Sequence, residues 1–405
     1  MAQTPITSTV IAIDIRRSAL HYYSMLGSDR ASIVHRVKNY AGEPFTEEFY
    51  QKFKDAVASF VEDEPSETVR KISVIIPDDA VAQDTLRLPL LRSGRQLNNA
   101  LSAKINNLYK NYEDLKILTH LAEKNKKYCA YSVAAVQKSI ISSISGACAE
   151  NRLLVDTLTY SSAATAAALN VLNPKMKNEN YLFLDIKDIY SRFIFVSGGR
   201  ATGFFTLPFG LEYLGSRKLI GEDMLFEHSL SELTVINARE RARAKKLTQM
   251  RELQDTASIE NAENEDLENT KTALESSLEL SQNSGAGQIK LLPKKTPRKL
   301  PQFMQRPIPE THEGIVEEKF RVFVKWGLGI LTSNPTLTSI GQPKCVYVNL
   351  PTEYQYIFDS LAKEEKENGI PFVRFTDADD DGELAHNLEL FGGLNTKLWH
   401  PSMKF

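Results

Sequence analysis

One pattern occurs twice in this chain and constrains its fold more than any other feature. Residues 10–15 read VIAIDI and residues 181–186 read YLFLDI, each with an aspartate as its fifth residue (Asp14 and Asp185). Continuous apolar runs of this length are typical of strands that are buried on both faces. Each run is followed by a turn and a second apolar run. The repeat predicts two related halves, each built around a buried strand and a hairpin.

The rest of the chain alternates between strand and helix patterns, which indicates an α/β protein. We predict further strands at 21–26, 71–76, 85–91, 128–134, 153–158, 192–197, 201–207, 346–350 and 371–375. Apolar spacing of three to four residues predicts helices at 46–62, 93–108, 135–151, 161–172, 233–247, 315–331, 354–367 and 384–394.

Residues 250–309 differ in composition from the rest of the chain. Residues 251–283 are rich in Glu, Asp, Asn and Ser and contain no aromatic residue, and residues 290–307 are basic and rich in proline. Such a segment cannot bury enough apolar surface to offset the entropy cost of ordering it. We predict a disordered insert.

Composition excludes several classes of protein. The formal net charge is −2 over 405 residues, so no overall field recruits nucleic acid or an anionic membrane, and we expect no nucleic-acid partner. The chain has three scattered cysteines and no metal-ligand spacing, which favours a reducing compartment. We also expect no secretory signal and no transmembrane helix.

The order of the segments resembles one branch of the actin-like ATPase superfamily, the branch of the type IV pilus assembly protein PilM and the cell division protein FtsA. The resemblance is carried by IIPDDAVAQDTLRLPLL at 75–91, by the strand and helix patterns of 127–169, and by YLFLDIKDIYSRFIFVSGGRATGFF from residue 181. It implies a two-lobed actin-like (ribonuclease H-like) α/β fold. The first lobe would span 1–178, with a small inserted subdomain at about 85–152. The second would span 179–398, interrupted by the disordered insert.

In that superfamily, the loops after the two strand-end aspartates hold the phosphates and metal of ATP, with a glycine that lets backbone N–H groups approach. Here Asp14 is followed by Ile15, Arg16, Arg17 and Ser18, and Asp185 by Ile186 and Lys187. The adenosine turn, expected after 346–348, begins at Asn349 and lacks the paired glycines. All three signature turns are altered.

The altered loops predict a degenerate nucleotide cleft made of Asp14, Arg16, Arg17, Ser18, Asp185, Lys187 and Asn349. We expect the three cations to pair with Asp14 and Asp185 and to close the cleft, so that the protein has no cofactor and does not hydrolyse ATP. The alternatives are that the cations bind phosphate as charges, with ATP and Mg²⁺ as cofactors, or that the alignment is wrong.

The resemblance implies a non-catalytic scaffold at the cytoplasmic face of a membrane machine, most simply a type IV pilus or related secretion system. Its partner would be a short cytoplasmic segment of a membrane protein, which would place the chain at the membrane periphery. The competing interpretation is a working ATP-binding protein of the cell division or filament type. A homo-oligomer stays open in either case.

Residues 377–382 read DADDDG, and Asp377, Asp379 and Asp381 occupy positions 1, 3 and 5 of a calcium-loop pattern. The acidic residue expected at position 12 is missing, because Leu388 stands there. We interpret the segment as a solvated acidic loop and predict no metal site, with calcium binding as the alternative.

Overall fold

The computed structural model describes residues 7–26, 29–40, 42–62, 70–91, 93–109, 112–124, 126–207, 210–215, 311–333, 343–354, 356–357, 370–375 and 387–395. Residues up to Ser216 and from Val316 onward form one compact unit. The predicted helix at 233–247, the insert at 250–309, most of the predicted helix at 354–367 and the acidic loop at 377–381 lie outside the described residues.

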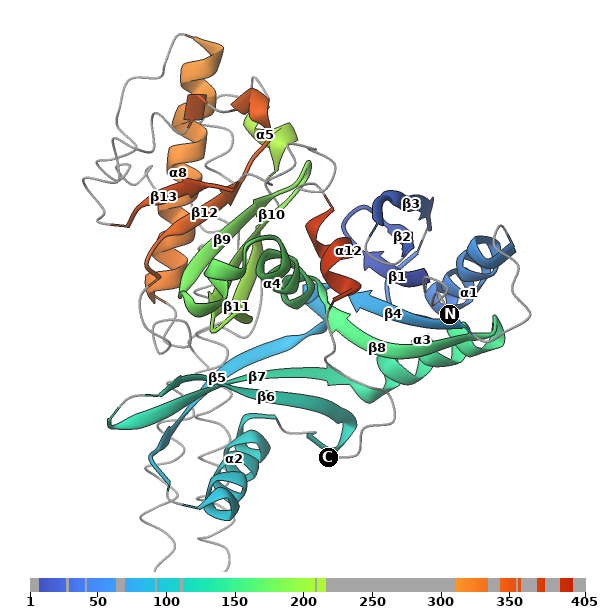
Figure 1. Cartoon of the computed structure of the whole chain (residues 1–405), viewed down its shortest axis with the longest axis horizontal. Coiled ribbons are helices and arrows are strands. Elements are labelled where there is room, and N and C mark those ends of the chain that lie inside the picture. The colour runs from blue at the N-terminus through green and yellow to red at the C-terminus, as the bar shows by residue number, and fades with distance from the viewer. Residues whose placement is uncertain are drawn as a thin grey trace, which may run out of the picture. The chain divides into compact units, whose positions relative to one another are not determined.

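The first lobe is built on a five-stranded sheet in the order β3-β2-β1-β4-β8 (Figure 1). Its strands are β1 (Thr7–Asp14), β2 (Ala19–Leu26), β3 (Asp29–Asn39), β4 (Arg70–Ile76) and β8 (Leu153–Tyr160). The first three are antiparallel neighbours, whereas β4 and β8 run parallel to β1. Helices α1 (Glu47–Glu62) and α3 (Lys138–Glu150) contact each other, and α3 contacts β8. Helix α1 buries Phe49, Phe53, Val57 and Phe60, which recur on one face.

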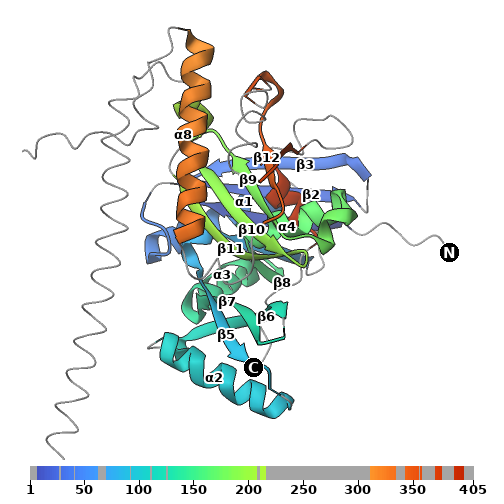
Figure 2. The same cartoon turned by 90° about the vertical axis from the view of Figure 1, so that its left-hand side faces the viewer.

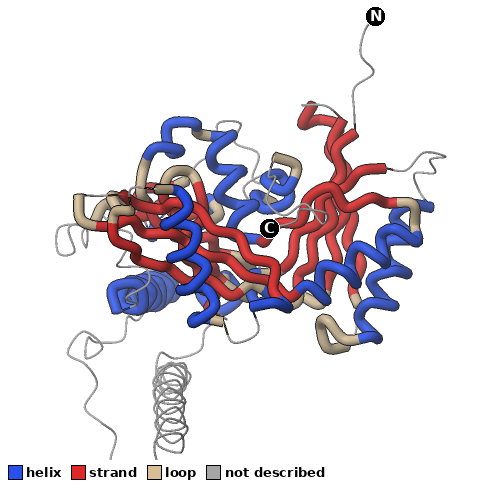
Figure 3. The backbone as a smooth tube through the Cα atoms, turned by 90° about the horizontal axis from the view of Figure 1, so that it is seen from below, coloured by secondary structure: helices blue, strands red, loops and turns tan. Residues whose placement is uncertain are grey.

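The second lobe repeats this arrangement with β11-β10-β9-β12-β13. Its strands are β9 (Tyr181–Ile186), β10 (Ser191–Ser197), β11 (Arg200–Leu207), β12 (Val346–Asn349) and β13 (Phe372–Arg374). Again the first three strands of the lobe, β9, β10 and β11, are antiparallel neighbours, whereas β12 and β13 run parallel to β9. Figure 3 shows the strands of both sheets in red, together with those of the inserted sheet. The shared strand order confirms the predicted relation between the two halves.

A smaller three-stranded sheet, β5-β7-β6, is inserted in the first lobe. It consists of β5 (Ala82–Pro89), β6 (Leu115–Lys124) and β7 (Tyr128–Gln137), with helix α2 (Gly94–Leu108) between β5 and β6 in the chain. The side chain of Ser93 caps α2 by accepting a hydrogen bond from the Gln96 N–H at 3.2 Å. Short 3₁₀ turns lie at η1 (Asp78–Ala80), η2 (Tyr112–Asp114), η3 (Pro174–Asn178) and η5 (Thr352–Tyr354).

Helices α4 (Ser161–Leu172) and α12 (Leu388–Gly393) lie between the two large sheets (Figure 1). They pack very closely, because a Cβ added at Gly392 would lie 1.7 Å from the carbonyl oxygen of Ala164. Helix α8 (His312–Ser333) runs beside β9, β10 and β11 (Figure 2), and its Phe323 packs on Phe193. The short helix α5 (Leu211–Gly215) follows β11. Among the described helices, none is both long and apolar enough to cross a membrane.

The predictions differ from the structure at several places, and β5 runs over Ala82–Pro89 instead of 85–91. The helix predicted from Ala135 begins at Lys138, because β7 continues to Gln137 and pairs with β5 and β6 there. Both Ala135 and Val136 are buried. Strands β3 and β6 were not predicted. Both are edge strands of mixed polarity, which lack the continuous apolar run of a buried strand.

Candidate functional site

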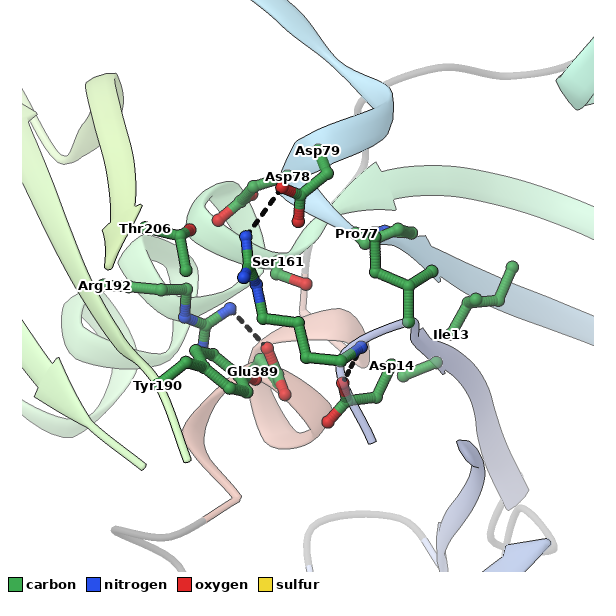
Figure 4. A pocket seen from close by; sticks show the side chains of 13 residues that line it. Ile13, Asp14, Pro77, Asp78, Asp79, Ser161, Tyr190, Arg192, Thr206 and Glu389 are labelled. Carbon is green, nitrogen blue, oxygen red and sulfur yellow. Dashed lines mark hydrogen bonds and ion pairs between the residues drawn. The ribbon is translucent and has the colours of Figure 1, made fainter. Parts of the chain in front are cut away.

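The candidate cleft lies where β1 and β4 of the first lobe face β10 and α12. Figure 4 shows side chains from these elements converging on it, with Arg192 and Glu389 in contact. Its lining residues are Ala12, Ile13, Asp14, Ile15, Arg16, Pro77, Asp78, Asp79, Ser161, Tyr190, Arg192, Thr206 and Glu389. The space left for water between them is about 20 Å³. That is roughly the space that one or two water molecules need.

The carboxylate of Asp14 is turned back onto its own loop. Its Oδ1 accepts hydrogen bonds from the backbone N–H groups of Arg16, at 3.0 Å, and Arg17, at 3.1 Å. The turn then passes through Ser18, whose φ of 49° lies in the left-handed region. Two N–H groups that could have faced a phosphate therefore already donate to Asp14.

The side chains of Arg16 and Arg17 pair with residues other than Asp14, so the predicted pairing with Asp14 is wrong. Arg16 contacts the Asp79 carboxylate at 2.8 Å, and its guanidinium lies 5.8 Å from the centre of the Tyr190 ring. Arg17 pairs with Asp188, in the loop after β9. Asp14 is already bound within its own turn, and the long arginine side chains reach carboxylates on neighbouring loops. The Arg17–Asp188 pair thus links the two aspartate loops directly.

Asp185 is fully buried and is bound by three neighbours. Its Oδ2 lies 2.7 Å from Arg192 and 3.5 Å from Lys187, and its Oδ1 accepts a hydrogen bond from Asn349 Nδ2 at 3.0 Å. The predicted Lys187–Asp185 pair is confirmed. Burial by itself raises the pKa of Asp185, but Lys187 and Arg192 together hold that pKa below its ordinary value. Asp185 is therefore ionised at neutral pH.

Arg192 is the centre of the buried charges, and sequence reasoning missed it. Besides Asp185 it contacts Glu389 Oε2 at 2.5 Å, and its guanidinium lies 6.0 Å from the Tyr190 ring centre. Glu389 belongs to α12, which packs on the first-lobe sheet through Leu390 and Gly393. The Arg192–Glu389 pair thus joins a second-lobe strand to a helix that packs on the first lobe. The available signal was an arginine directly before the apolar run at 193–196.

Asp78 is a second buried carboxylate that sequence reasoning missed. It follows β4 and accepts hydrogen bonds from the Ser162 N–H at 2.8 Å and the Ser162 hydroxyl at 2.6 Å. Burial raises the pKa of Asp78 to about 6. The side chains that line the cleft include four carboxylates (Asp14, Asp78, Asp79 and Glu389) and two cations (Arg16 and Arg192). The lining therefore carries more acidic than basic side chains.

Of the seven predicted cleft residues, Asp14 and Arg16 line the cleft. Asp185, Lys187 and Asn349 form a buried cluster instead, Arg17 pairs with Asp188, and Ser18 lies in the turn after Asp14. The calcium-loop residues Asp377, Asp379 and Asp381 lie outside the described residues. Across the described ranges, no group of three or more His, Cys, Asp or Glu side chains is arranged to hold a metal ion.

No protein-family model and no curated protein matches this sequence. Similar solved structures exist. A chain of the PilM–PilN type IV pilus biogenesis complex superimposes with a TM-score of 0.51 at 10% identity, over 96% of this chain and 97% of that one. This chain has the actin-like fold. The superposition pairs whole chain with whole chain, which agrees with the duplicated sheets.

Other actin-like structures are less similar. The cytoplasmic domain of EpsL, an inner-membrane component of the type II secretion system of Vibrio cholerae, gives a TM-score of 0.35 at 11% identity, over 52% of this chain and 74% of that domain. The apo ParM protein of pSK41 gives 0.34 at 10% identity, over 96% and 97%.

Proposed function

We propose that this actin-like protein is a non-catalytic scaffold that binds a short cytoplasmic segment of a membrane protein in a type IV pilus or related secretion assembly. One observation carries the non-catalytic part. The two aspartate loops, which by analogy would be the phosphate loops of the fold, are bound by the protein's own side chains. Actin-like chemistry needs room for phosphate, and about 20 Å³ is left between the side chains that line this pocket.

The way the loops are used supports the same proposal. Phosphate loops bind anions through backbone N–H groups that point at the ligand. Here the N–H groups of Arg16 and Arg17 donate to Asp14. Admitting a phosphate would require breaking these bonds and the Arg17–Asp188 pair, which links the two loops. The side-chain contacts thus favour a permanently closed cleft.

The partner is proposed from the fold. The similar solved chain comes from a complex named PilM–PilN, a type IV pilus biogenesis complex. By analogy, our protein would be recruited to the inner face of the cell membrane by its partner. A closed cleft suits this role, since it holds both lobes as one rigid support.

Affinity capture from solubilised membranes of the native organism tests the proposal. The tagged full-length chain should recover a membrane protein that has a short cytoplasmic segment, and the yield should be the same with and without Mg-ATP. Recovery of soluble partners alone would exclude the membrane role. Capture that requires ATP would contradict the non-catalytic role.

A further inference from the structure

The inserted subdomain has a charge opposite to that of the rest of the chain. Residues 82–137, from the start of β5 to the end of β7, contain nine lysines and arginines and four aspartates and glutamates, whereas all other residues together contain 40 and 47. The subdomain is therefore basic in a chain whose formal net charge is −2. An anionic surface would attract this subdomain and repel the remainder, which orients the chain with the subdomain toward that surface.

The basic residues gather at the end of the subdomain where β6 turns into β7. Lys124 of β6 and Leu88 of β5 both lie opposite Cys129 of β7, so the end of β5 lies beside this hairpin. In Figure 1 it is the end opposite to α3, which follows β7. We call it the basic tip and define it by four exposed residues, Arg87, Leu90, Lys124 and Lys126. Arg95, in the first turn of α2, is exposed as well.

The cations of the basic tip are not neutralised within the part of the chain that the structure describes. No described carboxylate forms an ion pair with Arg87, Arg95, Lys124 or Lys126. The Arg87 guanidinium lies over the Tyr128 ring, 4.8 Å from its centre. Glu123, next to Lys124, accepts a hydrogen bond from the Tyr128 hydroxyl at 3.5 Å. The positive charge of the tip is thus left for an anionic partner.

We propose that the basic tip binds the anionic phospholipid headgroups of a membrane surface, with the Leu90 side chain entering the headgroup region. Clusters of about four to eight basic residues are typical of surfaces that bind anionic lipid, and residues 87–95 and 124–127 contain six. Leu90 is 43% exposed among them. An apolar side chain beside basic ones strengthens binding at a membrane interface.

The chemistry of the tip favours lipid over an acidic peptide or a nucleic acid. Acidic peptide motifs are bound mostly by arginine clusters, which hold each carboxylate by two hydrogen bonds, whereas the hairpin supplies lysines. Single-stranded nucleic acid is bound by stacking its bases on aromatic rings, and the Tyr128 ring is already covered by Arg87. An exposed leucine beside lysines has a use at a lipid surface.

This contact goes beyond the proposed function, in which a protein partner brings the chain to the membrane. A single weak membrane signal gives reversible binding, and stable attachment takes two signals. The basic tip would be the second signal, added to the protein partner.

Flotation of the full-length protein with lipid vesicles tests the proposal. Vesicles of phosphatidylcholine and phosphatidylglycerol should carry the protein, and vesicles of phosphatidylcholine alone should not. Lys124→Gln combined with Lys126→Gln should weaken binding roughly 25-fold, because each basic residue near an anionic surface contributes about fivefold. Leu90→Ser should weaken binding at low and at high salt alike, since salt screens charges and not apolar contacts.

The matched control is Lys52→Gln combined with Lys54→Gln on α1. These two lysines are also one residue apart, and they pair with Glu48 and Glu150, so the same change of net charge there should leave vesicle binding unchanged. The proposal is overturned if phosphatidylglycerol vesicles do not carry the protein, or if the control weakens binding as much as the tip variant. Binding to polyglutamate in place of vesicles would also overturn it and identify an acidic peptide as the partner. The vesicles contain no protein, so membrane capture can fail while these results stand.

Discussion

Replacing Asp185 with alanine is the sharpest test of the buried charge cluster. The change removes a carboxylate with no solvent exposure that is held by Arg192 at 2.7 Å, Lys187 at 3.5 Å and Asn349 at 3.0 Å. Arg192 then retains its contact with Glu389, at 2.5 Å. The two buried cations, Arg192 and Lys187, then have one carboxylate fewer to balance their charge.

The expected cost follows from burial. Removing one partner of a buried ion pair typically costs about 3–5 kcal/mol. Because Glu389 still neutralises Arg192, we expect a loss near the lower end, about 3 kcal/mol. The loss should appear as a lower free energy of unfolding in urea, followed by circular dichroism.

Asp188→Ala is the matched control. Asp188 is three residues away and also pairs with an arginine, but the two side chains are 44% and 26% exposed. An exposed pair contributes at most about 1 kcal/mol. If the Asp185→Ala protein unfolds within about 0.5 kcal/mol of the parent, as for an ordinary surface site, the buried charge cluster does not exist. Equal effects of the two substitutions would lead to the same conclusion.

Three further predictions concern other parts of the chain. Asp14→Ala should cost only about 1–2 kcal/mol in urea unfolding, because Asp14 holds two backbone N–H groups of a half-exposed turn; a loss as large as that of Asp185→Ala would contradict this role. Asp78 has a folded-state pKa of about 6, above its ordinary value, so it destabilises the fold as the pH rises from about 4 to 6. Asp78→Asn should therefore gain stability relative to the parent over that range, and a constant difference would refute the assignment. Deleting residues 252–308 should leave the melting temperature nearly unchanged, since that composition contributes little core; a drop above roughly 10 °C would correspond to several kcal/mol and show that the insert packs.

The strands that were predicted best from the sequence are those whose residues are all buried. Strands such as β9, in which all six residues are buried, read as continuous apolar runs and were found from the sequence. Strands β3 and β6 carry polar residues on both faces, so they gave no comparable signal. A local pattern can also mislead. Ala135 and Val136 fit a helical pattern, but they are buried in the sheet, and that burial outweighs the local preference.

Of the seven predicted cleft residues, Asp14 and Arg16 line the cleft, and the partners of the cations were predicted only in part. The repeated strand–aspartate pattern located Asp14, Asp185 and their loops. The partners of the cations come from distant parts of the chain, as with Arg192 and Glu389, which are 197 residues apart. Pairings of this kind depend on how the two lobes meet, which no local pattern encodes. An arginine inside an apolar strand signals a buried partner without identifying it.

The central claim is that the cleft is closed to nucleotide by its own side chains. Isothermal titration of the full-length protein with a slowly hydrolysed ATP analogue and Mg²⁺ measures this directly. We predict no binding with a dissociation constant in the low micromolar range. A constant of about 1 µM, equivalent to about 8 kcal/mol of binding free energy, would show that the cleft opens and would contradict the account.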